Sequence, residues 1–188
     1  MARSLSRWLR CVSTGWVVLT TTAIFLLFTG LVLPAQSDRA EAETGDGPSP
    51  DTSFFYTRAD LYAMAEAYGD AGRRAYVRAR FTFDLIWPLV YTAFLATAIS
   101  WMYARGFPGG HGVQFANLAP LLGALFDYLE NVSTSLVMIR FPDRTPVLAI
   151  VAPVFTTVKW MFVGGSFGLL IIGTVAAVWQ WINNRSSS

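Results

Sequence analysis

The sequence contains very few of the residues that bind metals and haem or carry redox chemistry. Its 188 residues include one cysteine, Cys11, and one histidine, His111. One cysteine cannot form an internal disulfide, and one histidine excludes a bis-histidine haem and a three-histidine metal site within the chain. No nucleophile elbow, phosphate loop or cysteine pair is present. We therefore predict no metal site, no cofactor, no haem ligated within the chain and no catalytic residue.

Charge is scarce as well. Charged residues make up 14% of the chain and hydrophobic residues 54%, and the 14 basic residues nearly balance the 12 acidic ones. A near-neutral balance provides no basic surface for nucleic acid, so we exclude nucleic acid as a partner. A composition this apolar is typical of a multi-span membrane protein, with membrane lipids as its surroundings.

Four apolar runs are long enough to cross a bilayer, which requires about 20 residues. They cover residues 15–33, 81–103, 113–139 and 147–182. We therefore predict an all-α integral membrane four-helix bundle that forms a single domain, residues 1–188.

The first run admits two interpretations. Three arginines precede it and Ala35-Gln36-Ser37 follows it, a pattern that also occurs in cleaved secretory signals. We interpret residues 15–33 as a retained anchor helix.

The distribution of the arginines gives two conflicting indications of how the spans are oriented. An N-terminus in the cytoplasm places fewer arginines inside than outside, which favours the opposite orientation. The flanks of the first helix, three arginines before it and three acidic residues after it, favour a cytoplasmic N-terminus. We expect a multi-pass protein of the bacterial inner membrane with both termini in the cytoplasm.

The segment between the first two spans has two parts. Residues 34–56 are rich in Gly, Pro, Ser and acidic residues without hydrophobic periodicity, which predicts a linker that a partner protein has to hold in place. Residues 57–75 begin with a capping pair, Thr57 and Asp60, and continue as an amphipathic interfacial helix.

An arginine collar ends that amphipathic segment. We expect it to contact lipid headgroups or a partner, and a specific anionic ligand is the alternative. The collar consists of Arg73, Arg74, Arg78 and Arg80.

Polar residues inside the apolar runs form the main candidate site. The second run contains FDLIWPLVY, the third contains FDYLEN, and the fourth contains the chain's single lysine, Lys159. Helical spacing and depth place these groups in one half of the bilayer, where they can meet. We expect them to pair, because an unpaired charge in the bilayer is costly. The predicted cluster is Asp84, Tyr91, Asp127, Glu130, Asn131 and Lys159. A network that fixes helix register and a site that handles protons or a ligand both remain open.

Small residues also recur at helix-packing intervals. Gly164 and Gly168 form a GxxxG pair in the fourth run, and such pairs allow close approach of helices. Packing within the chain is the prediction that we prefer for them.

The residues ADLYAMAEAYGDAGRRAY, FDLIWPLVY, FDYLEN and Lys159 together resemble a group of small uncharacterised bacterial four-helix membrane proteins. That group shares an Asp-x-x-x-Pro-x-x-Tyr element and an Asp-x-x-Glu-Asn element, and the resemblance covers residues 57–159. It implies the fold and no activity. The chain is more loosely similar to the emopamil-binding type of four-helix domain, but it has no intramembrane histidine, which argues against an isomerase.

Two functions follow as hypotheses. The first is a non-catalytic accessory or structural subunit that packs against other membrane protein subunits in a larger complex, such as a respiratory or photosynthetic one. The second is a membrane enzyme or binder for a lipid or quinone-like molecule, with Asp127 or Glu130 as proton acceptor and Lys159 as its electrostatic partner.

Overall fold

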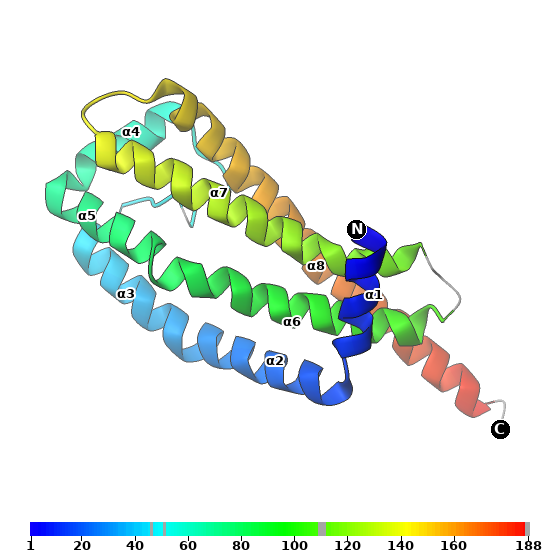
Figure 1. Cartoon of the computed structure of the whole chain (residues 1–188). Coiled ribbons are helices and arrows are strands. Elements are labelled where there is room, and N and C mark those ends of the chain that lie inside the picture. Colours follow the sequence, from blue (N-terminus) through cyan, green and yellow to red (C-terminus); the bar gives the residue numbers. More distant parts are fainter. Residues whose placement is uncertain (46, 51, 109–111, 187–188) are drawn as a thin grey trace. The chain divides into compact units, whose positions relative to one another are not determined.

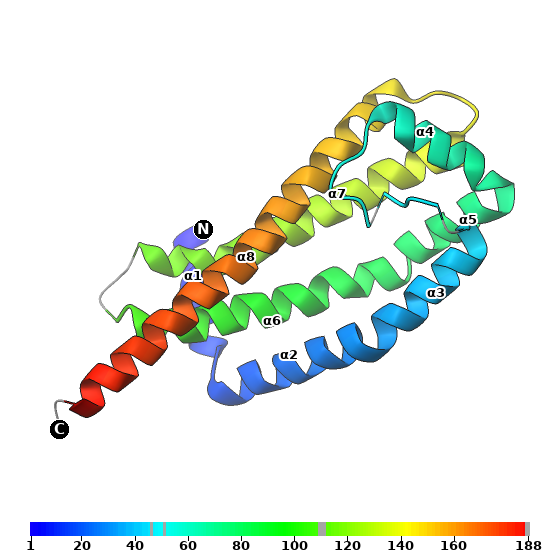
Figure 2. The same cartoon turned by 180° about the vertical axis from the view of Figure 1, so that it is seen from behind.

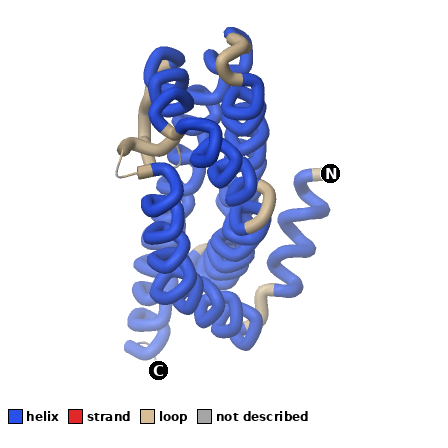
Figure 3. The backbone as a smooth tube through the Cα atoms, turned by 90° about the vertical axis from the view of Figure 1, so that its left-hand side faces the viewer, coloured by secondary structure: helices blue, strands red, loops and turns tan. Residues whose placement is uncertain are grey.

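The computed structural model describes residues 1–45, 47–50, 52–108 and 112–186, and these residues form helices and loops without a strand (Figures 1 and 3). His111 and two acidic residues of the predicted linker, Asp46 and Asp51, lie outside the described residues. The all-α prediction is confirmed. In chain order the elements are α1 (Ala2–Val12), α2 (Gly15–Leu27), the π-helix η1 (Phe28–Val32), α3 (Leu33–Thr44), α4 (Arg58–Ala67), α5 (Gly69–Arg80), α6 (Phe83–Gly106), the 3-10 helix η2 (Val113–Leu118), α7 (Ala119–Arg140) and α8 (Pro146–Ser186).

Three helical stretches of the described chain, rather than the predicted four, are long and apolar enough to cross a membrane. They are Gly15–Thr44, Gly69–Gly106 and Pro146–Arg185. The third predicted run, 113–139, is divided between η2 and α7 and does not qualify. The polar groups Asp127, Glu130 and Asn131 lower the hydropathy of α7, which reduces the gain from placing it in lipid.

The first predicted span is longer than the sequence pattern indicated. The helix does not end near Leu33 but continues without a break through η1 and α3 to Thr44, so half of the predicted linker is helical. Pro34 occupies the first turn of α3, where its missing N–H costs no hydrogen bond. The non-helical connection to α4 is therefore shorter than residues 34–56.

The predicted interfacial helix is in fact two helices. The capping box of α4 is confirmed, since Asp60 N–H donates to Thr57 Oγ1 at 3.2 Å and Thr57 N–H donates to Asp60 Oδ2 at 2.8 Å. Tyr68 separates α4 from α5, and Gly69, the first residue of α5, has φ of 60°, a backbone conformation that favours glycine. α5 then continues to Arg80, past the predicted end at residue 75.

The chain divides into two compact units, and the single domain of residues 1–188 stays a prediction. Unit 1 comprises residues 1–26, 90–123 and 161–188, and unit 2 comprises residues 27–89 and 124–160. In unit 1, α1 is bound to η2 and α6 through Asn117, whose Nδ2 donates to Ser6 C=O at 3.1 Å and to Ser100 Oγ at 2.9 Å. Stacking of Phe25 on Phe94, with ring centroids 4.5 Å apart, joins α2 to α6.

Unit 2 contains the main hydrophobic core of the described residues. α4 and α5 pack their apolar residues against the end of α7 and the start of α8, which the short turn after Arg140 brings together as an antiparallel pair (Figures 1 and 2). The core consists of Tyr56, Leu61, Tyr62, Met64, Ala65, Tyr68, Tyr76, Val137, Met138, Ala149 and Ala152. α3 packs against α5, where the close approach of Gly72 to Glu43 C=O leaves little room for a side chain.

Candidate functional site: layered polar groups in unit 2

The facing sides of α7 and α8 in unit 2 are arranged in layers along the two helices. Val137 and Met138 of α7 meet Ala149 and Ala152 of α8 in the apolar core. About one helical turn further along each helix lie the hydroxyl groups of Thr134 and Thr156, and one more turn along lie Glu130 and Lys159. Because the helices are antiparallel and rise about 1.5 Å per residue, equal steps along both keep these groups level with one another.

The charged layer is deeply buried. Lys159 Nζ lies 2.5 Å from Glu130 Oε2 and 3.8 Å from Asp127 Oδ1. Glu130 has no exposed surface, Lys159 is 5% exposed and Asp127 is 8% exposed. Asn131 Nδ2 donates to Asp127 Oδ1 at 3.4 Å. The structure therefore brings together these four predicted residues, Asp127, Glu130, Asn131 and Lys159, which we call the polar cluster.

The hydroxyl layer connects residues 52–80, which we call the cap, to both long helices. Tyr76 of α5 donates to Thr134 Oγ1 at 3.1 Å, and Thr156 donates to Tyr56, which precedes α4, at 3.1 Å. All four side chains are buried. Helical spacing by itself places Thr134 on the face of Glu130 and Thr156 on the face of Lys159, but it does not indicate their tyrosine partners. The sequence signal for that pairing is weak: both tyrosines lie outside the four apolar runs.

The other two predicted members of the cluster are Asp84 and Tyr91. Asp84, at the start of α6, forms an ion pair with Arg80, from Arg80 Nε to Asp84 Oδ2 at 2.8 Å. Both residues are 8% exposed. Tyr91 is also buried, at 3% exposed, but it belongs to unit 1.

Three of the four arginines in the collar have partners within the protein, and the contact with headgroups or a partner protein stays a prediction. Arg73 donates to Ala65 C=O, pairs with Asp70 and lies over the ring of Phe141. Arg78 pairs with Glu43 of α3 at 2.7 Å. Arg80, besides pairing with Asp84, lies over the ring of Tyr76. Arg74 is exposed on the surface of α5. Sequence patterns did not reveal the pairing of Arg78 with Glu43 of α3.

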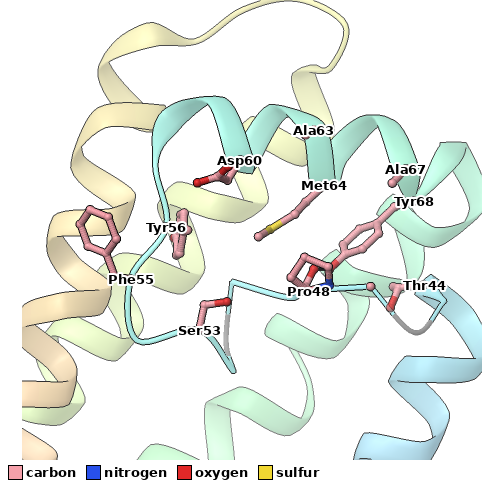
Figure 4. Close-up of a pocket in the computed structure, with 11 residues that line it drawn as sticks. Thr44, Pro48, Ser53, Phe55, Tyr56, Asp60, Ala63, Met64, Ala67 and Tyr68 are labelled. Atoms are coloured by element: carbon pink, nitrogen blue, oxygen red, sulfur yellow. Dashed lines mark hydrogen bonds between the residues drawn. The ribbon is translucent and has the colours of Figure 1, made fainter.

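A cavity of about 500 Å³ lies between α4 and the segment that precedes it (Figure 4). Met64 and Tyr68 extend from α4 toward Pro48 and Ser53 of that segment. Asp60 lines the same cavity, and hydrogen bonds from the Thr57 backbone N–H and hydroxyl hold the pKa of Asp60 below its usual value. A lowered pKa stabilises the fold at neutral pH, and that contribution is lost as the pH falls through the folded-state pKa.

The predicted packing pair Gly164 and Gly168 faces open space in the described part of the structure. A Cβ atom added at Gly164, Gly165 or Gly168 would meet nothing within 4 Å among the described residues. Close helix approaches occur instead at Gly106, where an added Cβ would lie 2.7 Å from Ala176, and at Gly173, where it would lie 2.6 Å from Tyr103.

Within the described ranges, no group of three or more His, Cys, Asp and Glu side chains is placed to hold a metal ion. Comparisons with protein-family models, with curated proteins and with solved structures give no match to this chain. The resemblance to small bacterial four-helix membrane proteins therefore stays a prediction.

Proposed function

We propose that this chain is a non-catalytic accessory subunit of a larger membrane complex, such as a respiratory or photosynthetic one, in the bacterial inner membrane. Its four-helix topology would include α7 as a span whose polar face is covered by α8 and the cap. The polar cluster would act as an internal clamp that holds α7 and α8 in register, because a buried charge that slips out of its pair is costly.

The observation that carries this proposal is the uncovered small-residue face of α8. Gly164 and Gly165 are exposed, and Met161 (71% exposed) and Ile171 (65% exposed) extend the same face at helical spacing. Exposed apolar residues alone are satisfied by lipid tails. A glycine notch differs, because it lets another helix backbone approach closely and gain van der Waals contact that lipid does not provide.

The test is a double substitution in the notch, Gly164→Leu with Gly168→Leu. The tagged chain is purified from its native membrane in mild detergent, and the proteins that accompany it are identified. We expect the double variant to lose the partner while its helix content and its thermal unfolding match the wild type, since a Cβ added at either glycine meets nothing within 4 Å among the described residues. Leucine also has a higher helix propensity than glycine.

Two control variants sharpen this test. Gly30→Leu, at another glycine with open space around it, should keep the partner. Gly173→Leu should instead damage unit 1 itself, because its side chain would collide with Tyr103. A wild-type chain that is purified alone, or a notch variant that keeps the same partner, would overturn the proposal.

The cavity beside α4 favours a second candidate function. Its volume and its lining of Phe55, Tyr56, Met64 and Tyr68 suit an apolar, ring-bearing or lipid-like molecule. Solvent extraction of the same purified sample separates the two functions, because a binder would release a stoichiometric lipid or quinone and a purely structural subunit would not.

A further inference from the structure

Helix α1 carries a basic face. Arg3, Arg7 and Arg10 lie on one side of the helix, because they are spaced at i, i+4 and i+7. Arg3 and Arg7 are exposed and Arg10 is half-buried. Among the described residues, no acidic side chain forms an ion pair with any of the three. The basic face is therefore open to an anion from outside the described chain.

The opposite face of α1 is apolar. Leu5, Trp8 and Val12 share this face, and at 3.6 residues per turn it lies nearly opposite the three arginines. Leu5 is 40% exposed and Trp8 is 59% exposed, so the described chain leaves both side chains partly uncovered. A helix with arginines along one face and leucine and tryptophan along the other is typical of helices that lie in the interface of a bilayer.

A third side of α1 fixes the helix on unit 1. Ser6 and Leu9 are buried on this side. The Ser6 hydroxyl donates to Gln114 C=O at 3.2 Å, and Asn117 Nδ2 donates to Ser6 C=O at 3.1 Å. Gln114 Nε2 also donates to Tyr103 C=O of α6 at 3.1 Å. Because these bonds join α1 to η2 and α6, the basic face and the apolar face have fixed directions in unit 1.

The position of α1 along the chain places it near a membrane surface. It ends at Val12, just before the first candidate span begins at Gly15, and η2 follows the second candidate span, which ends at Gly106. The two span ends lie together, since a Cβ atom added at Gly15 would lie 3.9 Å from Trp101 Nε1 of α6. The chain bends between α1 and α2, so α1 does not extend the first span outward into water (Figure 1).

We propose that α1 is an interfacial anchor that binds anionic phospholipids. Its apolar face packs among the acyl chains beside the span ends, and its arginines bind the phosphate groups of the anionic headgroups. A bilayer suits both faces at once, because it presents acyl chains and phosphate groups at adjacent depths, whereas an acidic protein surface would suit only the basic face. Trp16, which is 80% exposed at the start of α2, lies where tryptophan is enriched in membrane proteins. This inference requires only that α2 crosses a bilayer, so it stands apart from the subunit role and from the cavity.

Lipid binding to the purified full chain tests the proposal. The chain is delipidated in mild detergent, phosphatidylglycerol or phosphatidylcholine is added, and the bound lipids are counted by native mass spectrometry. We expect the wild type to prefer phosphatidylglycerol. A triple variant with Arg3→Gln, Arg7→Gln and Arg10→Gln should lose about tenfold or more of its affinity for phosphatidylglycerol, because each arginine near an anionic surface strengthens binding about fivefold. Its affinity for phosphatidylcholine should stay the same.

A matched control removes three exposed arginines from other parts of the chain. Arg39→Gln, Arg58→Gln and Arg144→Gln together lower the net charge by the same amount and should leave the lipid preference unchanged. Circular dichroism confirms that both triple variants keep their helix content. A wild type without the preference, or an equal loss of affinity in the two triple variants, overturns the proposal.

Spin labels test the placement of the two faces separately. Cys11 is exposed and lies one turn beyond Arg7, at the edge of the basic face. In bilayers that contain phosphatidylglycerol, a nitroxide on Cys11 should be reached by a water-soluble nickel reagent. A nitroxide at Leu5→Cys in a Cys11→Ser background should instead be reached by oxygen, which concentrates in lipid. Access of the nickel reagent to both positions, or the reverse pattern, would contradict the interfacial placement.

Discussion

At the scale of single residues, the position of Lys159 governs the electrostatics of unit 2. Its ammonium group lies between two carboxyl groups in a part of the chain where every partner is buried. An ion pair of this kind contributes little compared with a well-packed apolar replacement, but breaking it by removing one partner is strongly destabilising. We therefore expect the removal of Lys159 to destabilise the fold by more than the ion pair itself stabilises it.

We predict that Lys159→Met lowers the free energy of unfolding by about 3 to 5 kcal/mol at neutral pH. The deficit should shrink as the pH falls, because protonation neutralises the carboxylates that Lys159 would otherwise balance, and it should grow as the pH rises. Thermal unfolding in detergent at several pH values measures this dependence.

A second substitution identifies the partner of the lysine. Adding Glu130→Gln to Lys159→Met should restore stability more fully than adding Asp127→Asn, since Glu130 is the nearer carboxyl. Arg74→Met, at an exposed site, serves as the control and should change stability by no more than about 0.5 kcal/mol. Equal losses for Lys159→Met and Arg74→Met would contradict the clamp.

At the scale of elements, the cap is held on α7 and α8 by an apolar core and by two tyrosine–threonine hydrogen bonds. Tyr56 and Tyr76 reach the two helices one turn away from Lys159 and Glu130 respectively. Buried hydroxyl pairs are directional, so they fix the register in which α4 and α5 dock, whereas apolar contacts alone tolerate small shifts.

We predict that Tyr76→Phe and Tyr56→Phe each cost about 1 kcal/mol in unfolding free energy. The loss should be small because Thr134 and Thr156 keep bonds to the backbone carbonyls of Glu130 and Ala152. Hydrogen exchange should show faster opening of α4 and α5 in the double variant, with α7 protected as before. A loss of protection that spreads equally through α7 would show that the cap and α7 open as one unit.

At the scale of the whole molecule, helix length and composition bear on the number of membrane crossings. Three helical stretches of the described chain are long and apolar enough to cross a membrane. α7 is not among them, and it could cross only with its polar face shielded by protein. At about 1.5 Å per residue, the 41 residues of α8 extend about 60 Å, twice the hydrocarbon thickness of about 30 Å. Part of α8 therefore lies outside the hydrocarbon region if the helix crosses a bilayer.

Cysteine labelling tests the predicted topology directly. Cys11 is exposed and is the chain's only cysteine, and Asn184 is exposed near the other end. We expect a membrane-impermeant maleimide to label Cys11 in inside-out vesicles and not in intact cells. The same result is expected for Asn184→Cys in a Cys11→Ser background, because four crossings return the chain to the cytoplasmic side.

Opposite labelling of the two positions would mean an odd number of crossings and would contradict the four-helix topology. Labelling of both from outside the cell would keep an even number but reverse the orientation. Either result decides the topology, because both labelled positions are exposed and neither belongs to the polar cluster.

The sequence by itself determined the helical class and most of the polar cluster. A scarcity of charge and long apolar runs predict helices because backbone groups in lipid have to bond within one segment. The spacing Asp127, Glu130, Asn131 and Thr134 predicts one helix face, since positions three and four apart lie together. The capping pair of Thr57 and Asp60 was predictable for the same reason, because all of its contacts are local.

Only the tertiary structure decided which groups pair. Glu43 of α3 pairs with Arg78 of α5, and Tyr76 of α5 donates a hydrogen bond to Thr134 of α7. The helix that continues to Thr44 also extends beyond the apolar run that predicted it, because packing of α3 against α5 stabilises residues that show no hydrophobic periodicity. Such partners are distant in sequence, and their choice depends on which surfaces are buried together, a property that local spacing does not encode.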